Sequence, residues 1–215
     1  MAPPASDPDL LVLHGLRLKW LATAEALADA VDLPVGSVAE RLDAFAEKGW
    51  VRFRDGALTG WSLTPAGRVE AVARLTDELE ATGTKTAVKR SYEGFLAQNQ
   101  RFLDVCTDWQ VLPAEPGRRR ETPNDHADAD YDRKVIGELR AIDGDIQVVC
   151  DDLGATLARY GHYGARFERA LGLVEAGDTD WFTRPVIDSY HTVWFELHED
   201  LLATLGIERY RTDPT

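Results

Sequence analysis

The chain has 215 residues, of which 37 are acidic and 24 basic, so its net charge is −13. Its hydrophobic fraction of 44% is ordinary for a globular protein, and no apolar run approaches the roughly 20 residues of a membrane helix. These values argue against a membrane span and against a strong overall attraction to nucleic acid. The length allows one core or two small ones.

Two features indicate the compartment in which the protein works. The first ten residues lack a basic stretch followed by an apolar one, so we expect no secretion signal. The two cysteines, Cys106 and Cys150, are too few for a disulfide framework or a cysteine-based zinc site. We therefore expect a cytoplasmic protein whose thiols are reduced and buried.

The N-terminal part predicts three helices after a short disordered tail over residues 1–8. Apolar residues recur at helical spacing between positions 10 and 20. A second helix follows Thr23, which is a suitable N-cap. A third covers residues 35–48, because Pro34 suits its first turn and Gly49 suits the position just beyond its end.

The period of the pattern changes to two after Gly49, which predicts a pair of strands. Arg52 and Arg54 alternate with apolar residues in the first strand, and Asp55-Gly56 is a tight-turn signal. A further helix begins at Thr64-Pro65. The order helix, helix, helix, strand, turn, strand, helix predicts a winged helix-turn-helix over residues 9–80.

This segment resembles the MarR-type winged-helix regulators of bacteria. The matching positions lie at the end of the third helix and just after the second strand, and they are Leu42, Phe45, Gly49, Trp50, Val51, Leu63, Thr64 and Gly67. The resemblance covers about the first 80 residues. It implies a homodimer that binds double-stranded operator DNA, with the third helix in the major groove and the wing on the backbone.

Carried over position by position, the resemblance implies a set of DNA-binding residues on the third helix and the wing, namely Ser37, Arg41, Lys48, Arg52 and Arg54. Arginine suits bidentate guanine contacts, and the wing arginines suit phosphate contacts. The same helix also presents Glu40 and Glu47, so a solvated helix face is an alternative interpretation. We expect modest affinity with strong salt dependence, because a few local cations must overcome a net acidic chain.

Helical periodicity dominates from residue 86 onward and predicts an α-helical bundle domain over residues 86–215. A polar loop over residues 112–130 interrupts it and is a plausible hinge. The Arg118–Arg120 run in this loop is expected to be solvated. The fold class is thus mainly α, a winged helix-turn-helix followed by a helical domain for ligand binding and dimerisation.

The last predicted helix, with Thr183 as N-cap and Pro185 in its first turn, carries histidine and tryptophan on its apolar stripe. This pattern fits either a ligand pocket or a polar core network, because buried imidazoles need hydrogen-bond partners. The candidate ligand-binding residues are Trp109, His126, Trp181, Arg184, Tyr190, His191, Trp194 and His198. Arg184 is a candidate partner for an anionic effector.

Metal and catalytic motifs are not recognisable. Asp128, Asp130 and Asp132 alternate like the start of an EF-hand loop, but Arg133 and Leu139 stand where glycine and glutamate are required. The acidic residues also suit the N-terminus of the following helix, because of its dipole. We therefore predict no metal, no cofactor, no catalytic residue and no enzyme activity.

The function predicted from these features is a ligand-responsive transcriptional regulator that acts as a homodimer and binds a small-molecule effector of unknown type. The alternative is a small-molecule sensor or protein-interaction adaptor that uses the winged helix as a scaffold and does not bind DNA. An enzyme that uses the His, Asp and Trp residues of the second half is a third interpretation.

Overall fold

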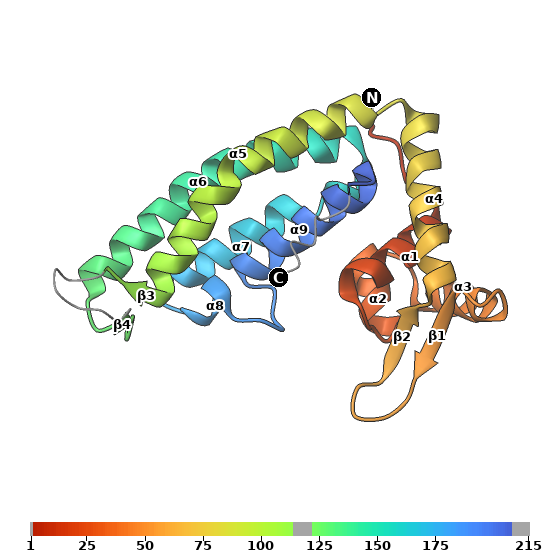
Figure 1. Cartoon of the computed structure of the whole chain (residues 1–215), viewed down its shortest axis with the longest axis horizontal. Coiled ribbons are helices and arrows are strands. Elements are labelled where there is room, and N and C mark those ends of the chain that lie inside the picture. Colours follow the sequence, from red (N-terminus) through yellow and green to blue (C-terminus); the bar gives the residue numbers. More distant parts are fainter. Residues whose placement is uncertain (1, 114–121, 208–215) are drawn as a thin grey trace, which may run out of the picture. The chain divides into compact units, whose positions relative to one another are not determined.

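The computed structural model describes residues 2–113 and 122–207, which are mainly helical with two short antiparallel strand pairs (Figure 1). None of the helices in these ranges is both long and apolar enough to span a bilayer. In chain order the elements are α1 (Pro8–Lys19), α2 (Ala24–Val31), α3 (Val35–Glu47), β1 (Val51–Arg54), β2 (Gly60–Leu63), α4 (Pro65–Thr82), α5 (Lys85–Gln110), β3 (Val111–Leu112), β4 (Thr122–Pro123), α6 (Ala129–Thr156), η1 (Ala158–Tyr160), α7 (Tyr163–Glu175), α8 (Asp180–Thr183) and α9 (Tyr190–Leu205).

The chain divides into two compact units. The first unit contains the chain up to Val88, together with Thr156–Arg159 and the chain from Glu199 onward. The second contains Lys89–Ala155 and Tyr160–His198. The first unit thus takes in two segments from the C-terminal half of the sequence, which no local pattern indicates.

Side-chain caps fix the starts of α1 and α2. The carboxylate of Asp7 accepts hydrogen bonds from the amides of Asp9 and Leu10, and Thr23 Oγ1 accepts one from the amide of Ala26. The carbonyl of Pro4 accepts a hydrogen bond from the amide of Ala158. The part of the expected tail from Pro4 onward therefore takes part in the fold of the first unit.

The β1–β2 hairpin follows α3 directly. Val51 pairs with Leu63 and Arg54 with Gly60, so the connecting loop covers residues 55–59 and is longer than the two-residue turn that Asp55-Gly56 predicts. A bridge between Ala22 and Trp61 adds a third short pairing on the other edge of β2. The hairpin is thereby attached to the segment between α1 and α2.

The start of α4 lies against the backbone of Trp50. Thr64 Oγ1 caps α4 by accepting from the amide of Gly67 at 3.1 Å, and it donates to the carbonyl of Gly49 at 2.6 Å. A Cβ atom on Gly67 would lie 1.9 Å from the carbonyl oxygen of Trp50. Thr64 and Gly67, two of the positions that resemble the MarR-type sequences, therefore have a packing role at this junction.

The first unit has a main core between α1, α2, α3 and the hairpin, with Leu13, Leu27 and Phe45 fully enclosed. A smaller cluster joins α1, α4 and the end of α9 through Leu10, Leu75 and Ala203. The C-terminal end of α9 is therefore a structural part of the first unit.

In the second unit α5 and α6 lie side by side and run antiparallel (Figure 1). Arg101 on α5 pairs with Asp145 on α6 at 3.1 Å, and Tyr131 at the start of α6 donates to the carbonyl of Asp108 near the end of α5. Cys106 and Cys150 are free and buried, as predicted, and burial raises the pKa of both thiols to about 12.

The predicted start of the last helix is wrong. Thr183 ends the short helix α8, and α9 begins seven residues later at Tyr190. Pro185 holds Arg184 in an extended conformation, and Val186 adopts a left-handed φ of 67°. The N-cap of α9 is Ser189, whose hydroxyl accepts a hydrogen bond from the amide of Thr192.

Candidate nucleic-acid interface

The N-terminal turn of α3 differs from those of α1, α2 and α4, because no side chain caps it. Like the first turn of α4, it contains no acidic residue. Pro34 occupies the cap position, and Val35 and Gly36 are exposed. Free amide groups and the positive end of the helix dipole favour an anion at such a terminus. This turn can accept a phosphate or a base edge without displacing a protein group.

Arg41, which the sequence places in a guanine-reading role, is held by neighbouring protein groups. Its Nη1 donates to Ser37 Oγ at 2.6 Å and to the Ser37 carbonyl at 3.0 Å. Its Nε lies 3.1 Å from a carboxylate oxygen of Asp9 on α1. Arg41 and Ser37 therefore fix α3 against α1 and leave little of the guanidinium for a ligand.

Lys48 at the end of α3 lies over aromatic rings. Its Nζ is 4.6 Å from the ring centroid of Trp50 and 6.0 Å from that of Phe45. Lysine in this position keeps its charge at the surface while its stem covers apolar area. It is available for a phosphate contact only at the cost of part of this packing.

The β1–β2 hairpin, which the sequence predicts to be a wing, presents the least encumbered cations of the predicted set. Arg52 and Arg54 are exposed on β1, and in the part of the chain that the structure describes neither guanidinium has an ion-pair or hydrogen-bond partner. They lie two residues apart on one strand and so on the same face. Two free guanidinium groups at this spacing suit adjacent phosphates.

Acidic residues share the exposed side of α3. Glu40, Asp43 and Glu47 are exposed, and none has an ion-pair partner among the described residues. They lie beyond the first turn of the helix. Close approach of a phosphate is therefore favoured at the N-terminal turn and at the wing, and is opposed along the rest of α3.

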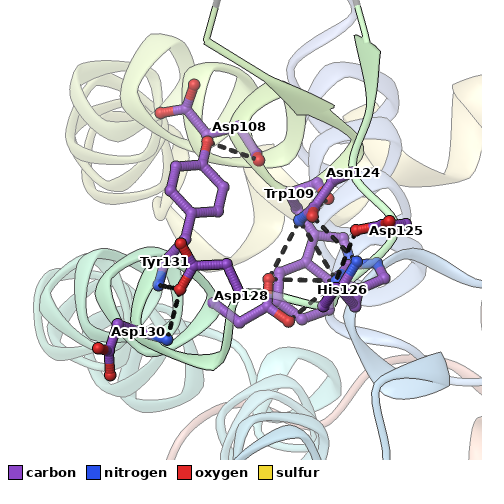
Figure 2. Close-up of polar contacts among 10 residues, drawn as sticks. Asp108, Trp109, Asn124, Asp125, His126, Asp128, Asp130 and Tyr131 are labelled. Carbon is purple, nitrogen blue, oxygen red and sulfur yellow. Dashed lines mark hydrogen bonds and ion pairs between the residues drawn. The ribbon is translucent and has the colours of Figure 1, made fainter.

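The candidate pocket residues of the second half lie in several places. At the end of α5, Trp109 is buried between His126, at a ring-centroid distance of 4.4 Å, and Phe182, with which it stacks at 4.4 Å (Figure 2). The Nδ1 atom of His126 lies 3.1 Å from Asp132, and Asn124 donates to the same carboxylate. Internal contacts therefore occupy the Asn124 amide, His126 Nδ1 and the Asp132 carboxylate.

The acidic run before α6 acts as a helix cap. Asp128 accepts hydrogen bonds from the amides of Asp130 and Tyr131, and Asp130 and Asp132 lie in the first turn of α6 (Figure 2). Within residues 2–113 and 122–207, no group of three or more His, Cys, Asp or Glu side chains is arranged to hold a metal ion. Arg118–Arg120 lie outside the described residues.

Two of the predicted pocket residues on α9 belong to a polar core. Tyr190 is fully buried and donates to Asp143 at 3.0 Å, and Trp194 donates to Asn99 at 3.1 Å while stacking on Phe102. Burial raises the pKa of both Tyr190 and Asp143, which keeps Tyr190 protonated as the donor.

His191 and His198 adjoin that core pair, because each shares an aromatic neighbour with Trp194. His191 and His198 lie on the half-exposed side of α9, near the rings of Phe102 and Phe95 respectively. His191 makes no hydrogen bond within the described residues, and burial lowers its pKa. Trp181 packs under Arg169, and Arg184, directly after α8, pairs with Asp180 at the start of that helix.

The first unit contains a buried charged cluster that the sequence did not reveal. Arg159 in η1 donates to Glu78 on α4 at 3.0 Å, to Asp200 on α9 at 2.6 Å and to Thr204 at 2.7 Å. His14 on α1 lies 2.9 Å from the same Asp200. The sequence gives only a weak indication of this cluster: Arg159 follows the end of a predicted helix, and Glu78 and Asp200 lie on the apolar faces of two others.

Asp200 is ionised in this charged cluster, because its pKa is lowered by its neighbours. Burial raises the pKa of Asp200, but the charges of Arg159 and His14 outweigh burial and hold the pKa below its usual range. The charged cluster therefore fixes the C-terminal segments onto α1 and α4 through ionised groups. This arrangement stabilises the first unit.

Comparison of the chain with models of known families, with curated proteins and with solved structures gave no match in any of the three. The functional argument therefore depends on the geometry of the two units.

Proposed function

We propose that the first unit is a winged helix-turn-helix of the MarR type and that the protein is a DNA-binding transcriptional regulator. The order α1, α2, α3, β1, β2, α4 supports this proposal, as does the Ala22–Trp61 bridge that ties the hairpin to the segment before α2. In this arrangement α3 is the recognition helix and the β1–β2 hairpin is the wing.

The observation that carries the proposal is the pair of free arginines on the wing, next to a recognition helix whose N-terminal turn is uncapped. Arg52 and Arg54 neutralise backbone phosphates, and the amides of Val35 and Gly36 approach the major groove. Arg41 positions α3 through Ser37 and Asp9 and does not read a base. This division of roles revises the one that the sequence predicts.

The first prediction is that Arg52→Ala/Arg54→Ala lowers the affinity for duplex DNA from the gene's own upstream region by roughly tenfold or more, because phosphate contacts are lost. Fluorescence anisotropy with a labelled duplex at low salt measures the change. Thermal unfolding of the variant should be unchanged, since both side chains are exposed.

A matched control removes the same charge from the second unit. Arg133→Ala/Lys134→Ala takes away two cations from α6 whose side chains are 72% and 71% exposed. We expect its affinity to stay within about twofold of the wild type, because Arg133 and Lys134 already pair with the carboxylates of Asp130 and Glu138 on α6. Equal losses in both variants would contradict a wing contact.

The second unit is the candidate effector domain of the proposed regulator, and the whole protein is proposed to act as a homodimer. A two-fold dimer places two recognition helices on half-sites about one DNA turn apart. An effector changes DNA binding only if it binds the two states of the protein with different affinity.

An adaptor that does not bind DNA is the second candidate function. It is favoured by the acidic side of α3 and by exposed apolar residues in the first unit, since Trp20 is 81%, Leu58 67% and Phe53 53% exposed. Exposed apolar side chains of this size suit contact with a protein partner. Absence of binding to any duplex at low salt, with specific retention of one protein partner, would support the adaptor.

A further inference from the structure

Two helical segments contribute residues to both units of the chain. Helix α9 belongs to the second unit as far as His198, and its residues from Glu199 onward belong to the first unit. Helix α6 belongs to the second unit as far as Ala155, and the residues that follow directly, Thr156–Arg159, belong to the first. The chain therefore crosses from one unit to the other within α9, and it crosses again at the end of α6.

These two segments are bonded to each other in the second unit. Tyr190, the first residue of α9, donates a hydrogen bond at 3.0 Å to Asp143 on α6. The side chain of Tyr190 is fully buried, so water does not replace this bond when it is lost. The hydroxyl of Tyr190 therefore fixes the start of α9 on α6.

The same two segments are bonded to each other again in the first unit. Arg159, three residues after the end of α6, donates to Asp200 on α9 at 2.6 Å and to Glu78 on α4 at 3.0 Å. Asp200 lies ten positions after Tyr190, which is about 15 Å along the helix. Since a helix transmits displacement along its length, a change in the packing of α9 at Tyr190 acts on Asp200 as well.

Asp200 also connects α9 to the helix that positions α3. His14 Nε2 on α1 lies 2.9 Å from Asp200 Oδ1, and both side chains are almost completely buried. Asp9, in the first turn of α1, lies 3.1 Å from Arg41 on α3. Polar contacts therefore lead from α9 through α1 to α3.

We propose that the charged cluster couples the packing of α9 on α6 in the second unit to the position of α1 in the first unit. An effector that changes how α9 packs would reach α3 by this route. That consequence for DNA rests on the proposed function, in which α3 is the recognition helix. The coupling itself involves no DNA, and neither does its test.

The second prediction is that Tyr190→Phe speeds hydrogen exchange of the backbone amides of α1 and α4 by about tenfold, although Tyr190 belongs to the second unit. The substitution removes only the hydroxyl that holds α9 on α6. Exchange followed by mass spectrometry on the full chain reports the peptides of each unit separately.

Tyr131→Phe is the matched control for this measurement. It removes a tyrosine hydroxyl from the same unit, but this hydroxyl bonds the start of α6 to the carbonyl of Asp108 on α5 and does not involve α9. We expect the exchange of α1 and α4 to stay within about twofold of the wild type in this variant.

A double-mutant cycle tests whether the charged cluster carries the coupling. Asp200→Leu removes the contacts with His14 and Arg159 and leaves Arg159 its bond to Glu78. In this background Tyr190→Phe should change the exchange of α1 and α4 by less than about twofold. Asp200→Asn, which keeps the size of the side chain, provides the same test with a smaller loss of stability.

Unchanged exchange of α1 and α4 in Tyr190→Phe would overturn the proposal, as would an equal increase in Tyr131→Phe. An effect of Tyr190→Phe that is the same size with and without the substitution at Asp200 would overturn it too. A wild type that does not bind DNA would leave all of these expectations in place, so the coupling and the proposed function can fail separately.

Discussion

At the scale of single residues, the same side chain has different roles in different surroundings. Arg41 is tied to Ser37 and Asp9, whereas Arg52 has no partner in the described part of the chain. Arg159 is buried between two carboxylates and acts as a structural ion. The availability of a guanidinium for DNA is therefore decided by neighbours that are distant in sequence.

The third prediction concerns the buried charged cluster. Arg159→Met should lower the free energy of unfolding by about 3–5 kcal/mol, because it leaves buried Glu78 without a cation and buried Asp200 with His14 alone. Urea unfolding followed by circular dichroism measures this. The control Arg140→Met breaks the exposed pair with Glu175 and should cost less than about 1 kcal/mol. Equal costs would show that the charged cluster does not stabilise the fold.

At the scale of elements, local sequence signals predicted most helix and strand boundaries correctly. Contacts between residues far apart in the sequence were not predicted. Thr23 and Thr64 cap their helices as predicted, because a cap involves residues only three positions apart. The start of α9 was missed, since Pro185 suits both a first helical turn and the extended turn that it forms. Asp200 and His14 are 186 positions apart, so no periodicity reveals their contact.

In the candidate site too, local features were predicted from the sequence and long-range contacts were not. Local pattern predicted α3 and the strand that carries Arg52 and Arg54, and both elements lie in the first unit with exposed side chains. It did not indicate that Asp9 would hold Arg41, or that Tyr190 and Trp194 would be satisfied by Asp143 and Asn99. These pairings depend on tertiary packing, which a single sequence does not display.

The fourth prediction belongs to the junction of the wing with α4. Gly67→Ala should destabilise the first unit by more than about 1 kcal/mol, because its Cβ overlaps the carbonyl oxygen of Trp50 and the backbone must move. Gly36→Ala is the control, since a Cβ there meets nothing within 4 Å. Thermal melts of both variants measure the difference, and similar midpoints would argue against the packing role of Gly67.

At the scale of the whole molecule, the account rests on local charge in an acidic protein. The net charge of −13 lowers non-specific affinity for DNA, while short-range contacts at the wing remain effective because salt screens the distant carboxylates. In the proposed homodimer, two β1–β2 hairpins place four arginines on one duplex. Dimerisation and DNA binding are thereby linked in the proposed regulator.

The salt dependence of duplex binding tests the central claim most directly. For the wild-type dimer, the logarithm of the association constant should fall linearly with the logarithm of salt concentration. In Arg52→Ala/Arg54→Ala the slope should be shallower by about 3 to 4, because four arginines each release about 0.9 counterion. Equal slopes for the two proteins, or a wild type that does not bind duplex DNA at low salt, would contradict it.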